Sequence, residues 1–292
     1  MKAKEFIQLF VPPIYYKVKK RLLPKKKTEY HPLPKVKRDG KRLIIIGNGP
    51  SLNQTMELYE KEILGTETMM VNFSARTPLY EHIRPKYYLM MDPNWLVMEG
   101  VLYESNKKCV IDIIEKTSWP MYIIMPSSFR DWWAIEEFRK NKNLTILFDE
   151  SEWRKYPETV LFPAFAENRI SPPTCTVLTY GIYLSLYWDY EETYLVGADT
   201  TFTHMAYVGQ HNNVLYSIDT HYYDNKDVYE ENVDPEKHGI PFGMSMEQYL
   251  SMCHSIFYEY GLMARYAKWK GLKVYNASEY SMIDCLERKK LS

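Results

Sequence analysis

Short apolar runs alternate along this chain with longer stretches in which apolar residues recur at helical spacing. The run at residues 41–46 (KRLIII) is continuous and β-branched, as is typical of a buried parallel strand. Further strands are predicted at residues 68–73, 87–91, 108–113, 121–125, 145–148, 193–197 and 273–276. Helices are predicted between them, up to residue 64 and at residues 129–140, 176–187 and 246–270. This alternation predicts an α/β fold with a mainly parallel, Rossmann-like sheet and helices on both faces.

The pattern breaks down at two places. Residues 24–40 are rich in Pro and charge and are typical of a linker, so we expect one folded domain over residues 41–292. Residues 200–245 are polar, rich in Tyr and His, and show no clear periodicity.

The first 42 residues carry 14 Lys and Arg against 3 Asp and Glu, whereas the rest of the chain is acidic. Apolar residues interleave with the lysines over residues 2–27, and Pro12-Pro13 divides them into two short helical pieces. Such a segment can lie on an anionic membrane surface. A disordered basic tail, or a helix packed on a neighbouring subunit, is the alternative. A nucleic-acid arm is not expected, because the acidic body shows no recognition motif.

The sequence contains no secretory signal and no apolar run long enough to span a membrane. Its four cysteines are scattered, without a C-x-x-C pair, which fits a reducing cytosol. We therefore expect a cytoplasmic protein, peripherally associated with the inner face of the cell membrane. Tyrosine is abundant, at 26 residues, and such rings either line sugar-like ligand sites or fill the core.

A glycine-rich loop, Gly47-Asn48-Gly49-Pro50-Ser51, follows the first predicted strand. Glycine lets a backbone approach a ligand closely, and the next helix would direct unpaired N–H groups at an anion. The loop matches neither the dinucleotide pattern G-x-G-x-x-G nor a Walker P-loop. It predicts a nucleotide site at the carboxyl edge of the sheet, with a tight structural turn as the alternative.

Two more strands end in polar residues. Asn72 closes one strand, and Asp92-Pro93-Asn94 follows the next. An Asn side chain offers a donor and an acceptor, suited to a ribose hydroxyl or a base edge. A D-x-D metal site is not expected, because the triplet supplies only one carboxylate.

Asn48, Asn72 and Asn94, in this order and spacing, together with the strand YEETYLVGAD ending at Asp199, resemble the bacterial lipooligosaccharide sialyltransferases. The resemblance covers roughly residues 41–280. It implies a single Rossmann-type domain (a variant of the GT-A fold) with a lid over about residues 200–245. It also implies a CMP-linked donor and neither a metal nor a cofactor.

The resemblance assigns donor-nucleotide contacts to the three asparagines and places Thr174 and Thr176 near a further donor contact. Cys175 and Thr176 depart from that family's T-S-G pattern. The family's general base, a His before the last long helix, is replaced here by Met244.

The base must then come from elsewhere, and the lid supplies four histidines. They are His204, His211, His221 and His238. We favour His221, because acid and aromatic neighbours could orient it and its ordinary pKa lies near the working pH. Tyr207 and Tyr222 are expected to support the departing phosphate, with Tyr216 and Tyr223 as alternatives. Asp199, at the end of its strand, is either a base or a helix or turn cap, and Asp92, beside Asn94, is a second carboxylate candidate.

The sequence thus predicts transfer of a sialic acid, or a related nonulosonic or Kdo-type sugar, to a glycan or glycolipid acceptor such as lipooligosaccharide or capsule. Two alternatives remain. The loop and the G-A-D strand also resemble pterin diphosphokinase-like proteins, which transfer phosphoryl groups from ATP with Mg²⁺. A non-catalytic glycan- or membrane-binding module is the other. Whether the chain forms a homo-oligomer is left open.

Overall fold

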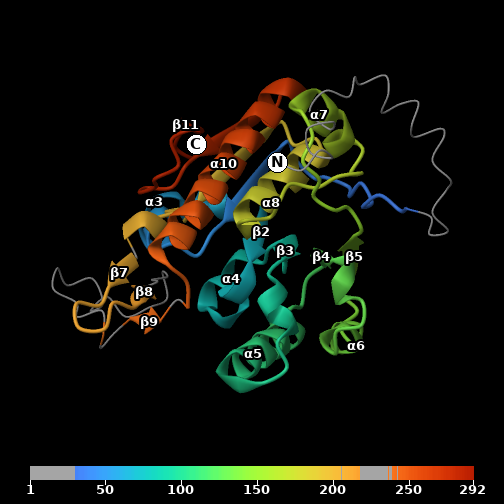
Figure 1. The fold of residues 1–292 in the computed structure, drawn as a ribbon. Coiled ribbons are helices and arrows are strands. Elements are labelled where there is room, and N and C mark those ends of the chain that lie inside the picture. Colours follow the sequence, from blue (N-terminus) through green and yellow to red (C-terminus); the bar gives the residue numbers. More distant parts are fainter. Residues whose placement is uncertain (1–29, 205, 218–235, 237–238, 242) are drawn as a thin grey trace.

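Eight parallel strands form the central sheet of the protein (Figure 1). The structure is a computed structural model, and it describes residues 30–204, 206–217, 236, 239–241 and 243–292. The sheet runs in the order β11-β10-β6-β1-β2-β3-β4-β5. The strands are β1 (Arg42–Ile46), β2 (Glu67–Val71), β3 (Tyr87–Leu89), β4 (Met121–Pro126), β5 (Leu144–Asp149), β6 (Glu192–Val196), β10 (Lys273–Asn276) and β11 (Glu287–Arg288). This confirms the predicted Rossmann-like α/β fold.

Helices cover both faces of the sheet. One face packs against α7 (Glu158–Ala166), α8 (Val177–Tyr187) and α10 (Met246–Lys270). The other packs against α3 (Ser51–Leu64), α4 (Pro78–Ile83), α5 (Gly100–Lys116) and α6 (Ala134–Phe138). Neighbouring strand residues point to opposite cores: Ile45 joins the first and Ile44 the second. That is why the strands are continuously apolar rather than alternating.

The sequence sets the ends of α10 and the burial of α8. Ser245 and Gln248 form a capping box at the start of α10, and Gly271 ends it at φ +72°, in the left-handed region. Residues of α8 are buried on all sides from Leu178 to Tyr187, as expected of a helix that is apolar all round.

The strand order reverses between β1 and β6. From β1 the chain adds β2 to β5 on one side, then returns to β6 on the other. The chain leaves β1 and β6 toward helices on opposite faces of the sheet, α3 and α10, and a crevice forms at the carboxyl ends of these strands, where ligands bind in open α/β sheets.

The predicted strand at residues 108–113 is wrong. These residues belong to α5, whose buried positions Asn106, Cys109, Val110 and Ile113 follow helical spacing. A short apolar run has the same local appearance in either state, and packing against the sheet decided for the helix. The predicted helix at 129–140 is also shorter: η3 (Ser127–Phe129) precedes α6.

The described part of the predicted linker lies against the domain. Leu33 is 1% exposed and belongs to the core beside α8. The Tyr187 hydroxyl donates to the Leu33 carbonyl at 2.6 Å, and the Trp188 indole donates to the Pro34 carbonyl at 3.1 Å. The packed chain thus begins upstream of Lys41, where the sequence placed the start of the domain.

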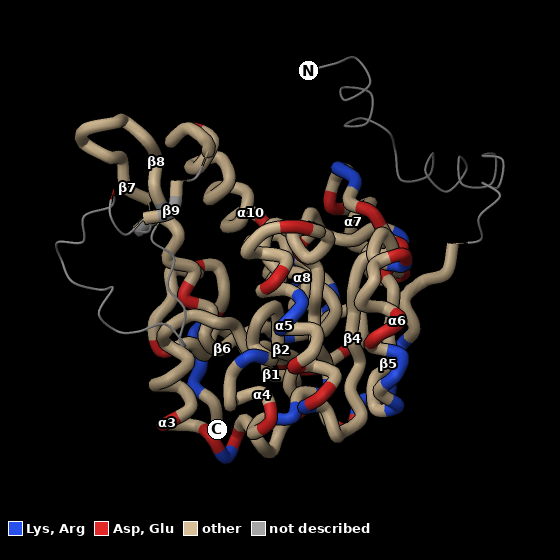
Figure 2. Tube along the Cα trace, turned by 90° about the horizontal axis from the view of Figure 1, so that it is seen from below, with Lys and Arg blue, Asp and Glu red and all other residues tan. Residues whose placement is uncertain are grey.

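Part of residues 200–245 forms a small antiparallel sheet of β7 (Ala206–Val208), β8 (Leu215–Ser217) and β9 (Ile240–Pro241) beside the start of α10. These strands lack Lys, Arg, Asp and Glu, whereas α3 and α5 carry both signs of charge (Figure 2). In the described part of the chain, no helix combines the length and the apolarity of a membrane span.

Candidate functional site

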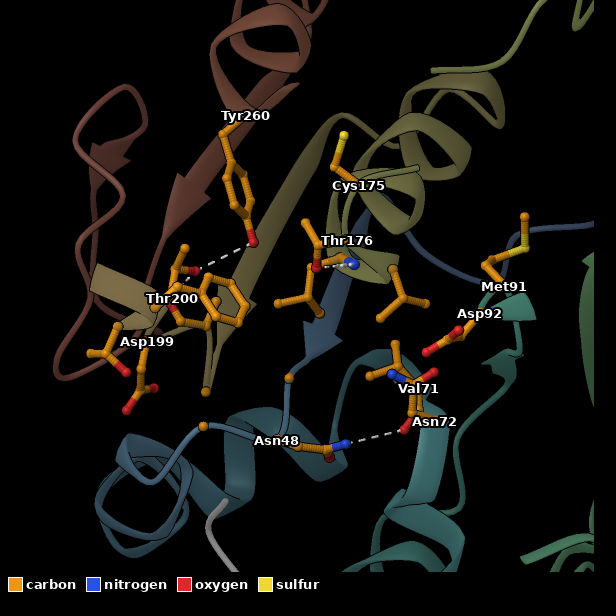
Figure 3. Close-up of a pocket in the computed structure, with 18 of the residues that line it drawn as sticks. Asn48, Val71, Asn72, Met91, Asp92, Cys175, Thr176, Asp199, Thr200 and Tyr260 are labelled. Carbon is orange, nitrogen blue, oxygen red and sulfur yellow. Dashed lines mark hydrogen bonds between the residues drawn. The ribbon is translucent and has the colours of Figure 1, made fainter. Parts of the chain in front are cut away.

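A pocket of about 520 Å³ opens at the carboxyl edge of the sheet, in the crevice between the β1 and β6 loops (Figure 3). Five segments line it, contributed by the ends of β1, β2, β3 and β6 and by the start of α8, and Tyr260 of α10 adds a wall. The segments are residues 47–50, 71–72, 91–93, 174–178 and 197–202. Its volume is in the usual range for a small-molecule site.

The glycines of the first loop are required by packing between two loops. A Cβ on Gly47 would lie 2.4 Å from the Gly197 carbonyl oxygen, and one on Gly49 would lie 2.3 Å from Asp199 Oδ1. The amide of Gly49 donates to the Gly197 carbonyl at 2.9 Å. The two glycines thus allow the β1 and β6 loops to touch and form the pocket floor.

The anion at the N-terminus of α3 is the carboxylate of Asp199. It accepts the Ser51 amide at 3.0 Å and also the Ser51 hydroxyl. Burial raises the pKa of Asp199, while the bonds from Ser51 oppose that rise. The sequence suggested either a base or a cap for Asp199, and this geometry is that of a cap. Ser51, expected to face the donor, is buried and lies outside the pocket lining.

Two of the predicted asparagines face the pocket. The Asn48 side chain accepts from the Ser74 hydroxyl at 2.7 Å and donates to the Val71 carbonyl at 3.4 Å, which fixes its amide (Figure 3). Within the described residues, the Asn72 Oδ1 atom is buried and has no hydrogen-bond partner. A buried acceptor without a partner is costly and can be satisfied by a ligand donor.

The third asparagine lies apart from them. Asp92 lines the pocket, and its Oδ1 atom accepts the Asn94 amide at 2.9 Å. That bond caps η2 (Pro93–Leu96) and places Asn94 on an exposed turn, outside the lining.

The wall at the start of α8 holds Thr174, Cys175 and Thr176. Thr176 Oγ1 accepts the Leu178 amide at 3.5 Å and caps the helix. The Thr174 and Cys175 amides both donate, at 2.7 Å, to the buried carboxylate of Glu259. These amides are therefore already bonded within the protein.

Three non-glycine residues with positive φ line this pocket. Asn72, Thr174 and Thr200 adopt φ of +51°, +63° and +54°, in the left-handed region. This conformation is unusual for the β-branched Thr. Strain of this kind persists where the surrounding structure enforces it, and it clusters at functional sites.

The predicted catalytic residues of the lid are only partly placed. Tyr207 lies on β7, 42% exposed and outside the pocket lining, opposite Tyr216 on β8. His221, Tyr222 and Tyr223 lie outside the described residues, as does His238. His211 lies beside Glu236, with Nδ1 at 3.3 Å from Oε1. Met244 directly precedes Ser245, the N-cap of α10.

No cluster of three or more His, Cys, Asp or Glu that could hold a metal ion occurs among the residues that the structure describes.

Sequence reasoning did not find several lining residues. Tyr260 comes from the middle of α10, where the sequence shows an ordinary amphipathic helix, and its neighbour Glu259 acts on the lining from behind, through the amides of Thr174 and Cys175. Thr200 and Thr201 directly follow Asp199 and could have been proposed with it. One signal in the sequence was available, since Glu259 is a charged residue on the helix face that carries the apolar Ile256 and Met263.

The sequence and the structure were compared with known proteins. No family model and no curated protein matches the sequence. Among solved structures, the chain is similar to the MAf glycosyltransferase from Magnetospirillum magneticum AMB-1, with 14% sequence identity and a TM-score of 0.46. The match covers 89% of this chain and 35% of that one, so this chain spans about a third of its length. A likeness of this size assigns no activity to the protein.

Proposed function

We propose that the protein is a glycosyltransferase that moves a sugar from a CMP-activated donor to a glycan or glycolipid of the cell surface, without a metal. The donor sugar is a sialic acid or a related nonulosonic or Kdo-type sugar. This proposal rests on the resemblance of the three asparagines and the G-A-D strand, and on the pocket described above.

One observation carries the proposal. The loops that follow β1 and β6 meet in a pocket at the point where the strand order reverses, Asn48 and Asn72 both line it, and two hydrogen bonds orient the Asn48 amide. Asn72 lines the pocket, and its side-chain amide is proposed to bond a ribose hydroxyl or a base edge.

The described lining of the pocket is acidic, and its charge does not separate the two kinds of nucleotide donor. Among the described lining residues, the charged side chains are the carboxylates of Asp92 and Asp199. A CMP-linked nonulosonic acid carries one phosphodiester charge and the carboxylate of its sugar, about the same total charge as a nucleoside diphosphate sugar, so the choice of donor rests on the binding measurement.

The chemistry is proposed to come from the lid. His221 would act as the base, and Tyr207 and Tyr222 would donate to the leaving phosphate. Residues 2–27 would hold the protein at the inner face of the membrane, close to a lipid-linked acceptor.

Thermal-shift binding with CMP, CDP, UDP, GDP and ATP, with and without Mg²⁺, tests the donor. A ligand at a hundred times its Kd adds about 2.7 kcal/mol to the free energy of unfolding, a readily visible shift. Selective, metal-independent stabilisation by CMP is the expected result. A Mg²⁺-dependent response to ATP alone would instead indicate phosphoryl transfer, and no response to any nucleotide would indicate a binding module.

Alkylation of cysteines tests the location of the site. Cys175 and Cys285 are both exposed, but only Cys175 lines the pocket. CMP should slow the alkylation of Cys175 and leave that of Cys285 unchanged, as followed by peptide mass spectrometry. Equal rates with and without saturating CMP would place the ligand elsewhere.

A further inference from the structure

Glu259 is a buried carboxylate in the middle of α10, with a fractional exposure of 0%. Its two oxygens are used separately. Oε1 accepts the Thr174 amide and Oε2 accepts the Cys175 amide, each at 2.7 Å. The carboxylate therefore binds two consecutive amides of the loop before α8.

This loop forms one wall of the pocket, and its conformation has to be maintained. Thr174 adopts φ +63°, which a β-branched residue rarely does. A bidentate carboxylate that grips the amides of Thr174 and Cys175 offsets that strain, because hydrogen bonds to a charged acceptor are about twice as strong as neutral ones. The bonds also fix where Thr176 and the α8 N-terminus lie.

A side chain that only filled the space occupied by Glu259 would not need to be charged. Burial raises the pKa of Glu259, and the amides of Thr174 and Cys175 oppose that rise. A buried carboxylate costs stability, and apolar side chains of similar size are often at least as stabilising in a core. The next residue on the same helix, Tyr260, lines the pocket and lies with its hydroxyl 3.5 Å from Thr200 Oγ1 (Figure 3).

We infer that Glu259 is a positioning residue for the ligand pocket: by binding the Thr174 and Cys175 amides, it holds the loop before α8 in the shape that receives the nucleotide. The inference rests on the proposed function, in that it takes CMP as the ligand. Glu259 itself does not line the pocket and acts through the loop.

The test compares Glu259→Gln with a matched variant, Asp149→Asn. Asp149 is also a buried carboxylate, accepts the Ser151 amide at 2.9 Å, and lies outside the pocket lining. Gln keeps one acceptor but turns an NH₂ group toward the second amide. We expect CMP to bind about ten- to a hundred-fold more weakly to Glu259→Gln, the loss that corresponds to one charged hydrogen bond. Asp149→Asn should bind CMP like the wild type.

Amide hydrogen exchange gives a readout that needs no ligand. The peptide covering residues 172–178 should exchange faster in Glu259→Gln than in the wild type and in Asp149→Asn. Unchanged exchange there, or unchanged CMP affinity in a wild type that binds CMP, overturns the inference. A wild type that does not bind CMP overturns the proposed function, and the exchange measurement still decides whether Glu259 holds the loop.

Glu259→Met covers the case in which Glu259→Gln folds poorly. It removes the buried charge at similar length and also leaves the Thr174 and Cys175 amides without their acceptor, so the melting temperature should fall, and CMP binding is measured below it, on the folded protein. CMP affinity should fall as in Glu259→Gln. Wild-type affinity in a well-folded Glu259→Met protein would show that the carboxylate does not position the loop.

Discussion

Individual atoms decide how the pocket floor is built. Gly49 leaves room for Asp199, whose carboxylate accepts the first free amide of α3 from the loop that follows the neighbouring strand β6. Ser51 supplies both donors of this contact. The N-terminus of α3, which the sequence predicted to bind a phosphate, therefore binds the Asp199 side chain instead.

Gly49→Ala should damage both stability and ligand binding. The new Cβ would meet Asp199 Oδ1 at 2.3 Å and the Gly197 carbonyl at 2.7 Å, so the two loops must separate. We expect a loss of about 1–3 kcal/mol in the free energy of unfolding, as for overpacked sites. Urea denaturation measures it. Gly40→Ala is the control, because a Cβ there meets nothing closer than 4.0 Å. Equal stability of the two variants would contradict the loop contact.

Asp199→Asn should change how stability depends on pH. Burial raises the pKa of Asp199 above its ordinary 3.8, so the folded state holds this proton more tightly than the unfolded state. Its contribution to stability is present at low pH and is lost as pH rises from 3.8 through the folded pKa.

The variant removes this titration. Urea denaturation at several pH values between about 4 and 7 should show a smaller fall in stability with rising pH in Asp199→Asn than in the wild type. Glu259, whose pKa burial also raises, retains its own contribution of the same sign. Identical pH profiles would mean that the Asp199 carboxyl titrates normally.

At the scale of elements, helix ends were predicted well where local chemistry defines them. Ser245, Gln248 and Gly271 mark both ends of α10, and the predicted bounds match the observed ones. Residues 108–113 were predicted wrongly because a short β-branched run gives no local signal that separates a strand from a buried helical face. Only the tertiary packing of α5 against the sheet shows that these residues are helical.

Ser245→Ala should fray the start of α10. The variant removes the acceptor for the Gln248 amide, and loss of such a cap costs about 1 kcal/mol. Thermal unfolding would detect it. Ser251→Ala, at an exposed interior position of the same helix, should be neutral or slightly stabilising. A comparable loss in both variants would argue against the capping box.

At the scale of the whole molecule, a segment outside the regular elements completes the core. Leu33 fills a space beside α8, and its backbone is tied to Tyr187 and Asn168. No periodic pattern accompanies this segment, so the sequence predicted a linker. Its contacts come from residues more than a hundred positions away.

Two truncations test this view of the domain. A chain that begins at residue 30 is the reference, because it keeps every described contact of Leu33. A chain that begins at residue 41 should lose several kcal/mol, since Leu33 alone accounts for about 2–5 kcal/mol when it is cut back to Ala in a packed core. Chemical denaturation of both truncated chains and of Leu33→Ala provides the measurement. A chain from residue 41 as stable as the one from residue 30 would restore the linker interpretation.

The sequence by itself determined the α/β class, most strands, the bounds of α10 and the loops at the carboxyl edge, because apolar periodicity, caps and glycines act through neighbouring residues. Only the tertiary structure decided that Asp199 caps α3, that Glu259 holds the Thr174 loop, and that Asn94 lies outside the pocket. These contacts join residues far apart in the chain, and their partners are set by strand order and helix packing. Neither strand order nor helix packing can be predicted from the residues next to each contact in the sequence.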